Sequence, residues 1–359
     1  MLKAAAPALP AIDVLVDALQ QRTSWPMMRD ALKREKFPVG LGWKELLGHA
    51  AENTPQGQKM RTFLQTYFAE STITGDRFIQ LYEVEEQVIS NIIGKLTNVT
   101  APNSVFSDCY PLPLAKKLLP GAPDEPILCE IRSHASGDVS LVFCSVRSFD
   151  DRLSYQYAEL PKQVQDTYRE IDKLITIRKD YYQAYDVINI RKDLHRLEIC
   201  IDQPSKSGSG DLDTLPLKVL SACALHISDL AGFGAIPPEN LFSAISAMYA
   251  SKNEGTVKSL SFRTMTGSIK KERMTSQSVD LRDEKFHHAG MNAVGQKIDP
   301  YEISLDLEFT LPPGQASLRL AALIREIASA TPTLHGCYVS AATSSSLQQA
   351  LNRLVTYIH

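Results

Sequence analysis

The most regular pattern of apolar and polar positions lies in mid-chain, where two β-like stretches flank a short polar turn. In residues 196–202, leucine or isoleucine alternates with charged residues, which is the two-residue period of a strand with one buried face. Residues 185–190 carry apolar side chains on both faces, as expected of a strand covered on both sides. The pattern predicts a hairpin over 185–202, near the middle of a sheet.

Other stretches show the same two-residue period. Residues 301–311 alternate without error between apolar and polar side chains, so one face of this strand is expected to be buried and the other wet. Residues 127–132 and 139–146 are separated by a polar hexapeptide that suits a hairpin turn. Further short strands are predicted at 257–265, 278–282 and 336–341.

Helical periodicity dominates the first 98 residues. Apolar residues at three- and four-residue spacing predict short helices at 12–19, 26–36, 43–51 and 60–69, followed by a long helix with a broad apolar face at 78–96. The same spacing predicts later helices at 162–177, 217–230, 239–250, 318–327 and 347–358, the last one capped by Ser345 or Ser346.

A proline-rich stretch from 97 to 126 provides the best domain boundary. We therefore predict a helical domain over 1–98 and a second domain over 99–359, with a flexible loop at 203–213. Hairpins mixed with helices, and strands with one wet face, favour the α+β class over a doubly wound parallel sheet. The expected core of the second domain is a mixed, largely antiparallel sheet covered by helices.

Composition and charge argue against several classes of function. With 38 basic and 41 acidic residues, the formal net charge of −3 argues against a surface coated in positive charge for non-specific nucleic-acid binding. Apolar runs are too short to cross a bilayer, so we expect a cytoplasmic protein that does not bind membranes. The six dispersed cysteines contain no Cys-x-x-Cys pair, which favours reduced thiols over disulfides or a zinc site.

One candidate for chemistry is a nuclease-like carboxylate site. Such a site uses acids on adjacent strands to hold a divalent cation such as Mg²⁺ and to orient water. Arg132 stands where a lysine is expected, and a guanidinium is a poor general base. We therefore favour solvated acids on the wet face of a sheet over catalysis. The residues of this alternative site are Asp124, Glu130, Asp186 and Glu198.

A second candidate is the mildly basic segment 258–288, with seven lysines or arginines against four acids. If the segment forms a β-ribbon, its cations can follow phosphates. The alternative is a solvated loop without a partner. Adjacent histidines on a strand point to opposite faces, so no zinc site is expected there. The candidate binding residues are Arg263, Lys270, Lys271, Arg273, Arg282, Lys285, His287 and His288.

The N-terminal helices offer a weaker possibility of DNA recognition. Their basic residues suit a helix-turn-helix unit, although scattered lysines are common on any soluble helical domain. Trp25 and Trp43 are expected to close the small core of this region. The basic residues in question are Lys33, Arg34, Lys36, Lys44, Lys59 and Arg61.

These observations favour a non-enzymatic binding or accessory subunit over an enzyme. Signatures of nucleophilic catalysis and of dinucleotide binding are missing from the sequence, and one basic appendage is present. The expected partner is a nucleic acid or another protein, contacted through 258–288 without any cofactor. Homo- or hetero-oligomers, and a role in bacterial defence or DNA processing, are compatible with this reading. The alternative is a metal-dependent hydrolase or nuclease.

Overall fold

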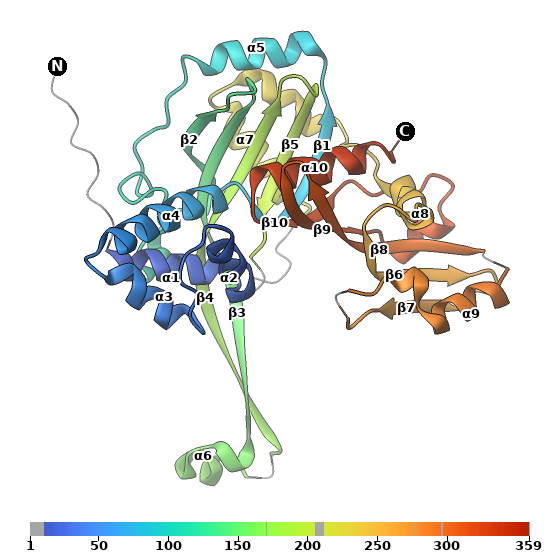
Figure 1. The fold of residues 1–359 in the computed structure, drawn as a ribbon, viewed down its shortest axis with the longest axis horizontal. Coiled ribbons are helices and arrows are strands. Elements are labelled where there is room, and N and C mark those ends of the chain that lie inside the picture. The colour runs from blue at the N-terminus through green and yellow to red at the C-terminus, as the bar shows by residue number, and fades with distance from the viewer. Residues whose placement is uncertain (1–10, 170, 205–211, 277, 296, 359) are drawn as a thin grey trace.

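The computed structural model describes residues 11–169, 171–204, 212–276, 278–295 and 297–358. Its centre is a ten-stranded antiparallel sheet in the order β2-β3-β4-β5-β1-β10-β9-β8-β6-β7, and an N-terminal helical bundle packs beside it (Figure 1). The predicted α+β class is therefore confirmed. The strands are β1 (Gly75–Glu83), β2 (Ile127–Ser133), β3 (Val139–Gln156), β4 (Lys173–Arg191), β5 (Arg196–Asp202), β6 (Thr256–Thr264), β7 (Ile269–Arg273), β8 (Ile298–Thr310), β9 (Pro313–Ala321) and β10 (Cys337–Ala341).

The α-helices fall into three groups: a bundle before the sheet, helices on one face of the sheet, and helices on the other. No helix in the described ranges is both long and apolar enough to span a membrane. The helices are α1 (Ile12–Arg22), α2 (Trp25–Arg34), α3 (Trp43–Ala51), α4 (Pro55–Ser71), α5 (Glu86–Leu96), α6 (Lys162–Thr167), α7 (Leu215–Ala224), α8 (Phe242–Ala250), α9 (Lys285–Ala293) and α10 (Ser344–Val355).

The bundle α1–α4 forms as predicted and has its own core. Leu19, Met28 and Leu64 are buried at its centre, and the two tryptophans pack against this core. The rings of Trp25 and Trp43 meet edge to face with centroids 5.4 Å apart, which is a favoured aromatic geometry. The expected role of these two residues in closing the bundle is therefore confirmed.

The helices cover opposite faces of the sheet at its two ends. At the β2–β5 end, α5 and α7 bury one face together with the short 3-10 helix Ser228–Ala235. At the β8–β10 end, α8 and α10 bury the other face (Figure 1). As a result, the described helices leave one face of β6–β9 uncovered, and its outward side chains are serines and charged residues.

The mid-chain hairpin forms as predicted, and the structure supplies its register, which the sequence left open. β4 and β5 pair antiparallel from Val187–Cys200 to Arg191–Arg196. Because side chains alternate along each strand, Glu198 and Asp202 share one face of the sheet, whereas Asp186 lies on the other. The three acids of this hairpin therefore do not form one cluster.

Residues 78–83 are a strand rather than the start of a helix. β1 is a central strand: Ile79 and Leu81 enter one core, whereas Tyr82 enters the core on the other face. A strand that is apolar on both faces resembles the wide apolar face of a helix in sequence. The expected helix begins only at α5, and residues 75–83, within the first 98, belong to the sheet.

Three other predicted elements are also wrong. The helix predicted at 162–177 is the six-residue α6 followed by the start of β4, because apolar residues at helical spacing there belong to two elements. The helix predicted at 318–327 is divided between the end of β9, where Leu318 and Leu320 are buried and Arg319 faces outward, and the 3-10 helix Ile324–Ala328. The strand predicted at 278–282 contains the 3-10 turn Leu281–Asp283 instead.

The other predicted elements are present, but some bounds differ: β3 and β4 extend well beyond the predicted 139–146 and 185–190, and the helix predicted at 217–230 is α7, which ends at Ala224. Thr343, not Ser345 or Ser346, caps α10 by accepting a hydrogen bond from the Ser346 N–H. Most of the predicted loop 203–213 lies outside the described residues.

A buried ion cluster joins the bundle to the sheet. Arg22, the last residue of α1, donates two hydrogen bonds to the Asp202 carboxylate at 2.8 and 3.1 Å, and a third to the Ser71 carbonyl at the end of α4. On the sheet side, the Arg77 guanidinium lies 3.6 Å from the same carboxylate, and the Tyr185 N–H donates to it at 2.9 Å. Asp202 is therefore the common partner of three separate elements.

Burial alone would raise the pKa of Asp202, but the positive charges of Arg22 and Arg77 outweigh burial and hold that pKa below its usual value. The carboxylate stays ionised in the folded protein at neutral pH. Its charge compensates two guanidinium groups that are themselves almost fully buried.

We expect Asp202→Asn to lower the free energy of unfolding by about 3–5 kcal/mol, because it leaves two buried arginines without a countercharge. Urea denaturation at pH 7 measures this loss. The matched control is Asp229→Asn, which removes an exposed ion pair with Lys95 and should cost less than about 1 kcal/mol. Equal effects of the two changes would show that the cluster does not hold the bundle in place.

Candidate functional site

The acids of the alternative carboxylate site lie apart and have other partners. Asp124 is exposed in the loop before β2, and Glu130 lies on edge strand β2. Glu130 accepts hydrogen bonds from Arg132 and from the Tyr110 hydroxyl. Arg132, where the sequence departs from a nuclease pattern, thus neutralises Glu130.

Asp186 and Glu198 point to opposite faces of the sheet, and arginines neutralise both. Asp186 pairs with Arg147 and accepts the Asp202 N–H at 2.9 Å. Glu198 lies between Arg191 at 3.0 Å and Arg196 at 2.7 Å. Within the described ranges, no group of three or more histidine, cysteine, aspartate or glutamate side chains could hold a metal ion.

The Glu198 cluster is a structural network inside the sheet. The Asn189 amide donates to Glu198 at 3.1 Å, and Asp138 adds a second carboxylate 3.4 Å from Arg191. Burial acts to raise the pKa of Glu198, but Arg191 and Arg196 lower it below its ordinary value. A depressed pKa suits a permanent anion and is the opposite of what a general acid near neutral pH needs.

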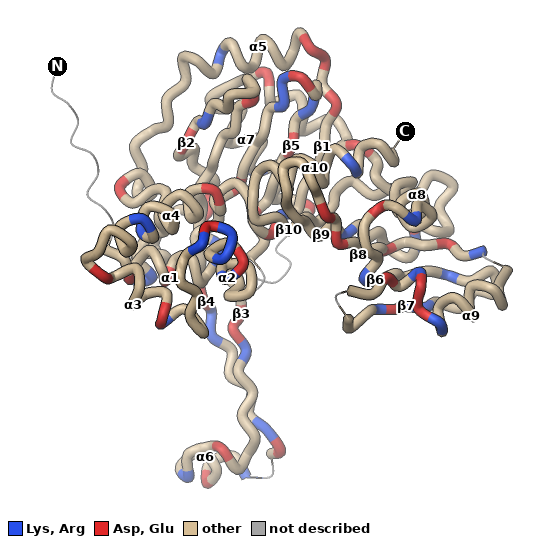
Figure 2. Tube along the Cα trace, viewed as in Figure 1, with Lys and Arg blue, Asp and Glu red and all other residues tan. Residues whose placement is uncertain are grey.

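The first part of the basic segment forms a ribbon at the far edge of the sheet, which is one of the two possibilities that the sequence left open. β6 and β7 pair antiparallel from Ser259–Arg273 to Arg263–Ile269, and the connecting turn 265–268 is exposed. Residues Lys285–Ala293 form α9 rather than a strand. Figure 2 shows that basic and acidic residues lie close together on β7 and at the start of α9, whereas the rest of α9 carries neither.

Four of the eight candidate binding residues have partners within the fold. Arg263 pairs with Asp299 at 2.8 Å, and Lys271 lies 3.3 Å from Glu302. Arg282 pairs with Asp280 at 2.7 Å and also donates to the carbonyls of Ser251 and Gly255. The Arg282 side chain therefore ties the chain before β6 to the turn before α9.

His287 is the fourth of these residues and is buried. Its Nδ1 lies 2.5 Å from a Glu272 carboxylate oxygen, and its Nε2 lies 2.7 Å from the Tyr249 hydroxyl. This side chain connects α9, β7 and α8, so it serves packing rather than an exposed binding surface. The neighbouring His288 is exposed on α9.

Lys270, Arg273 and Lys285 are exposed, and no ion pair of theirs is found among the described residues. Strand alternation separates the first two. Lys270 lies opposite Phe262 on the face that α9 covers, whereas Arg273 lies opposite Ser259 on the uncovered face. The sequence could not reveal this division because it depends on which face of β6 is buried.

The uncovered face continues from β7 across the neighbouring strands. A single row crosses it through paired residues: Arg273, Ser259, Ser304, Arg319 and Tyr338. The Arg319 guanidinium lies 5.2 Å from the Tyr338 ring centroid, in cation–π contact. Sequence reasoning missed Arg319 because its segment was read as a helix, and it missed Tyr338 because the place of that residue in the row depends on strand order.

The row ends on β1 with a second aromatic side chain. Phe78 pairs with Tyr338, and their rings meet edge to face at 5.3 Å between centroids. Gly336 permits this arrangement, since a Cβ atom there would come within 2.3 Å of the Phe78 ring. The uncovered face thus combines serines, two arginines and two half-buried aromatic rings.

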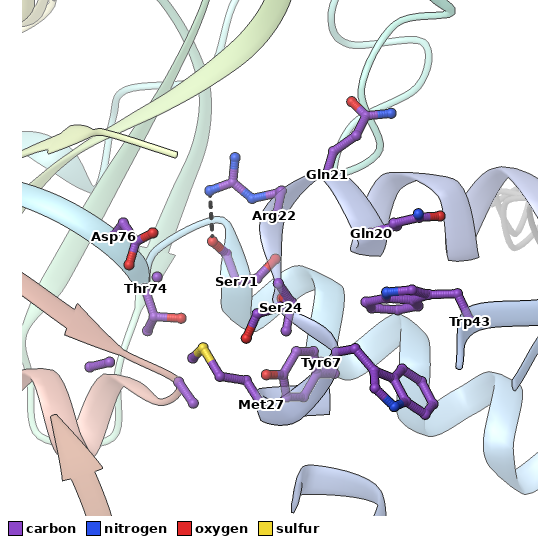
Figure 3. A pocket seen from close by; sticks show the side chains of 15 residues that line it. Gln20, Gln21, Arg22, Ser24, Met27, Trp43, Tyr67, Ser71, Thr74 and Asp76 are labelled. Carbon is purple, nitrogen blue, oxygen red and sulfur yellow. Dashed lines mark hydrogen bonds between the residues drawn. The ribbon is translucent and has the colours of Figure 1, made fainter. Parts of the chain in front are cut away.

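A separate pocket of about 460 Å³ lies at the junction of the bundle and the sheet. Trp43, Tyr67 and Met27 line its helical side, and Asp76 and Thr74 line the β1 side (Figure 3). Burial raises the pKa of Tyr67, so its hydroxyl stays protonated. The pocket contains no convergent set of reactive groups, and its wall includes part of the ion cluster around Arg22.

The thiols and the N-terminal cations give no reactive site. All six cysteines are free, and burial raises the pKa of Cys200 to about 12, which keeps that thiol protonated. Arg61 donates to the carbonyls of Ala50 and Glu52 and so completes the end of α3. Lys33, Arg34, Lys36, Lys44 and Lys59 are exposed.

The depressed pKa of Glu198 gives a pH prediction. This carboxylate stabilises the fold fully above its unfolded pKa of about 4.3, and the contribution is lost as pH falls through the lower folded value. We expect Glu198→Gln to lower stability by roughly 3 kcal/mol at pH 7. The variant should also lose less stability than the wild type between pH 5 and pH 2. Urea denaturation across this range measures both effects, and identical pH slopes would contradict the assignment.

Two surfaces therefore remain as candidates for function: the uncovered sheet face with its arginine and aromatic row, and the pocket beside the bundle. The sequence matches no protein-family model, and no curated protein matches it.

Proposed function

We propose that this chain is a non-catalytic binding subunit that holds single-stranded nucleic acid on the uncovered face of β6–β9. The observation that carries the proposal is the row of paired residues from Arg273 on β7 to Tyr338 on β10 and Phe78 on β1. With strands about 4.8 Å apart, the row extends roughly 24 Å, long enough to contact several nucleotides.

The chemistry of the row suits a single strand. Cations bind phosphates without regard to sequence, whereas aromatic rings and guanidinium planes stack on unpaired bases. Arg273 supplies an exposed cation at one end, and Arg319 with Tyr338 supplies a stacking surface at the other. Ser259 and Ser304 between them are small, so a ligand can approach the strands closely.

The balance of charges on this face favours a moderate, salt-dependent affinity for nucleic acid. Arg319 and Lys271 both contact Glu302, at 2.8 and 3.3 Å, so part of their charge is already compensated. A nucleic acid must compete with this internal carboxylate for both cations. Binding through few phosphate contacts is therefore expected, in keeping with the acidic protein as a whole.

Binding to short labelled single-stranded DNA and RNA, followed by fluorescence anisotropy at several salt concentrations, tests the proposal. We expect Lys271→Gln combined with Arg273→Gln to weaken binding and to reduce the salt dependence of log K by roughly 0.7 for each lost phosphate contact. Lys270→Gln is the matched control, because it removes a neighbouring lysine from the opposite face. Equal losses of affinity in the double variant and in the Lys270→Gln control, or no binding by the wild type, would refute the proposed surface.

The same samples distinguish a binding subunit from an enzyme. Incubation of the wild type with Mg²⁺ and the same oligonucleotides should leave them intact. Divalent-dependent cleavage that Glu130→Ala abolishes would favour the carboxylate alternative and overturn the non-catalytic assignment.

A further inference from the structure

A group of exposed apolar side chains lies on a two-stranded arm. β3 and β4 pair without a break from Val139–Ile190 to Gln156–Lys173. β2 accompanies β3 only as far as Cys144, and β5 accompanies β4 only from Val187 onward. The outer half of the hairpin therefore projects from the body as a ribbon with α6 at its tip (Figure 1).

The tip is an ordered structure in its own right. The Tyr157 hydroxyl donates to the Gln165 carbonyl at 2.9 Å, and the Gln165 amide donates back to the carbonyls of Tyr157 and Leu160. Leu160 is buried beneath this network. Since the end of the arm is closed and capped, the arm is a defined projection and not a frayed loop.

Strand alternation gives the arm two different faces. On the first face, Ile175 and Ile177 are 50% and 59% exposed. On the second, Leu153 and Tyr155 are 47% and 36% exposed. An isolated two-stranded ribbon is marginal in water, and this one leaves apolar side chains uncovered on both sides. Burial of either face by a partner would therefore remove apolar surface from water.

The two faces carry opposite charge. The isoleucine face contains Arg152, Lys173 and Lys179 with a single acid, Asp150. The leucine–tyrosine face, made of positions 149–155 and 174–180, contains two acids and one base. The Arg178 guanidinium lies between the acids, 3.0 Å from Asp151 and 3.6 Å from Asp180.

Each face is thus complementary to the other in charge as well as in its apolar centre. The whole segment from 148 to 181 holds six basic and seven acidic residues, so the arm as a unit does not attract phosphates. A second copy of the chain supplies the matching surface.

We propose that copies of this chain associate through their arms, with the isoleucine face of one arm packed on the leucine–tyrosine face of the next. Such a contact joins two different surfaces and is heterologous, so it closes into a ring or continues as a chain of subunits. Face-to-face ribbons lie about 10 Å apart, close enough to bury all four exposed apolar side chains. This association is independent of nucleic-acid binding by the opposite end of the sheet.

Sedimentation velocity of the full chain over a range of concentrations tests the proposal. The wild type should form species larger than a monomer. Ile175→Ser with Ile177→Ser disables one face, and Leu153→Ser with Tyr155→Ser disables the other, so each double variant alone should sediment as a monomer. Thermal unfolding should show the body of both variants folded, because these side chains do not enter its cores.

Mixing the two double variants gives the decisive result. One variant retains the leucine–tyrosine face and the other retains the isoleucine face, so an equimolar mixture should form a dimer that cannot grow further. A monomeric wild type would overturn the proposal. A mixture that stays monomeric would also overturn it, because the two intact faces, one on each variant, would then fail to bind each other.

Discussion

The arrangement of the molecule depends on one buried carboxylate. Asp202 ends β5 at the point where the helical bundle meets the sheet, and it is the shared acceptor for Arg22 of the bundle and Arg77 of β1. The surrounding backbone is fixed through the same groups: Arg77 donates to the carbonyls of Thr72 and Thr74, which connect α4 to β1. The bundle is thereby attached by directional polar contacts, in addition to apolar packing. Such contacts specify one orientation, whereas apolar surfaces alone tolerate several.

The second constraint is the placement of helices on opposite faces at the two ends of one long sheet. A sheet of ten strands has more surface than the described helices cover, and each end buries the face that its own helices reach. The distribution of apolar and polar side chains along the strands follows this division. Near α5 and α7, strands β1 and β4 carry apolar side chains on both faces, whereas β8 and β9 place leucines toward α8 and α10 and charged or serine side chains outward. The uncovered polar face is thus a direct result of how the helices are distributed.

Sequence periodicity identified most of the strands, whether one or both faces are buried, but it misread two strands as helices. Residues 301–311 were recognised because every second side chain is buried. β1 was mistaken for a helix because it is buried on both faces, and β9 because Leu318 and Leu320 were read together with the following apolar residues. The 185–202 hairpin itself, by contrast, was correctly predicted because its two strands flank a polar turn, although the sequence left its register open.

The candidate surfaces were only partly predictable, for a related reason. The sequence offered a ribbon within 258–288 only as one of two possibilities, and the structure forms it over β6 and β7. Its cations divide between two faces, and several pair with acids that are distant in the sequence, as Arg263 does with Asp299. Arg319 and Tyr338 join the row only through strand order, which local sequence does not contain. The arm was hidden because its outer strand was read as part of a helix.

The unbroken pairing of β3 and β4 also connects the exposed arm to the centre of the sheet. The same two strands that form the exposed arm continue into the middle of the sheet, where they carry Arg147, Tyr185 and Asp186. Those side chains, or their backbone groups, contact Asp202 or its neighbouring atoms. The backbone pairing is continuous from tip to centre, so the exposed arm and the residues that anchor the bundle belong to one hydrogen-bonded ribbon.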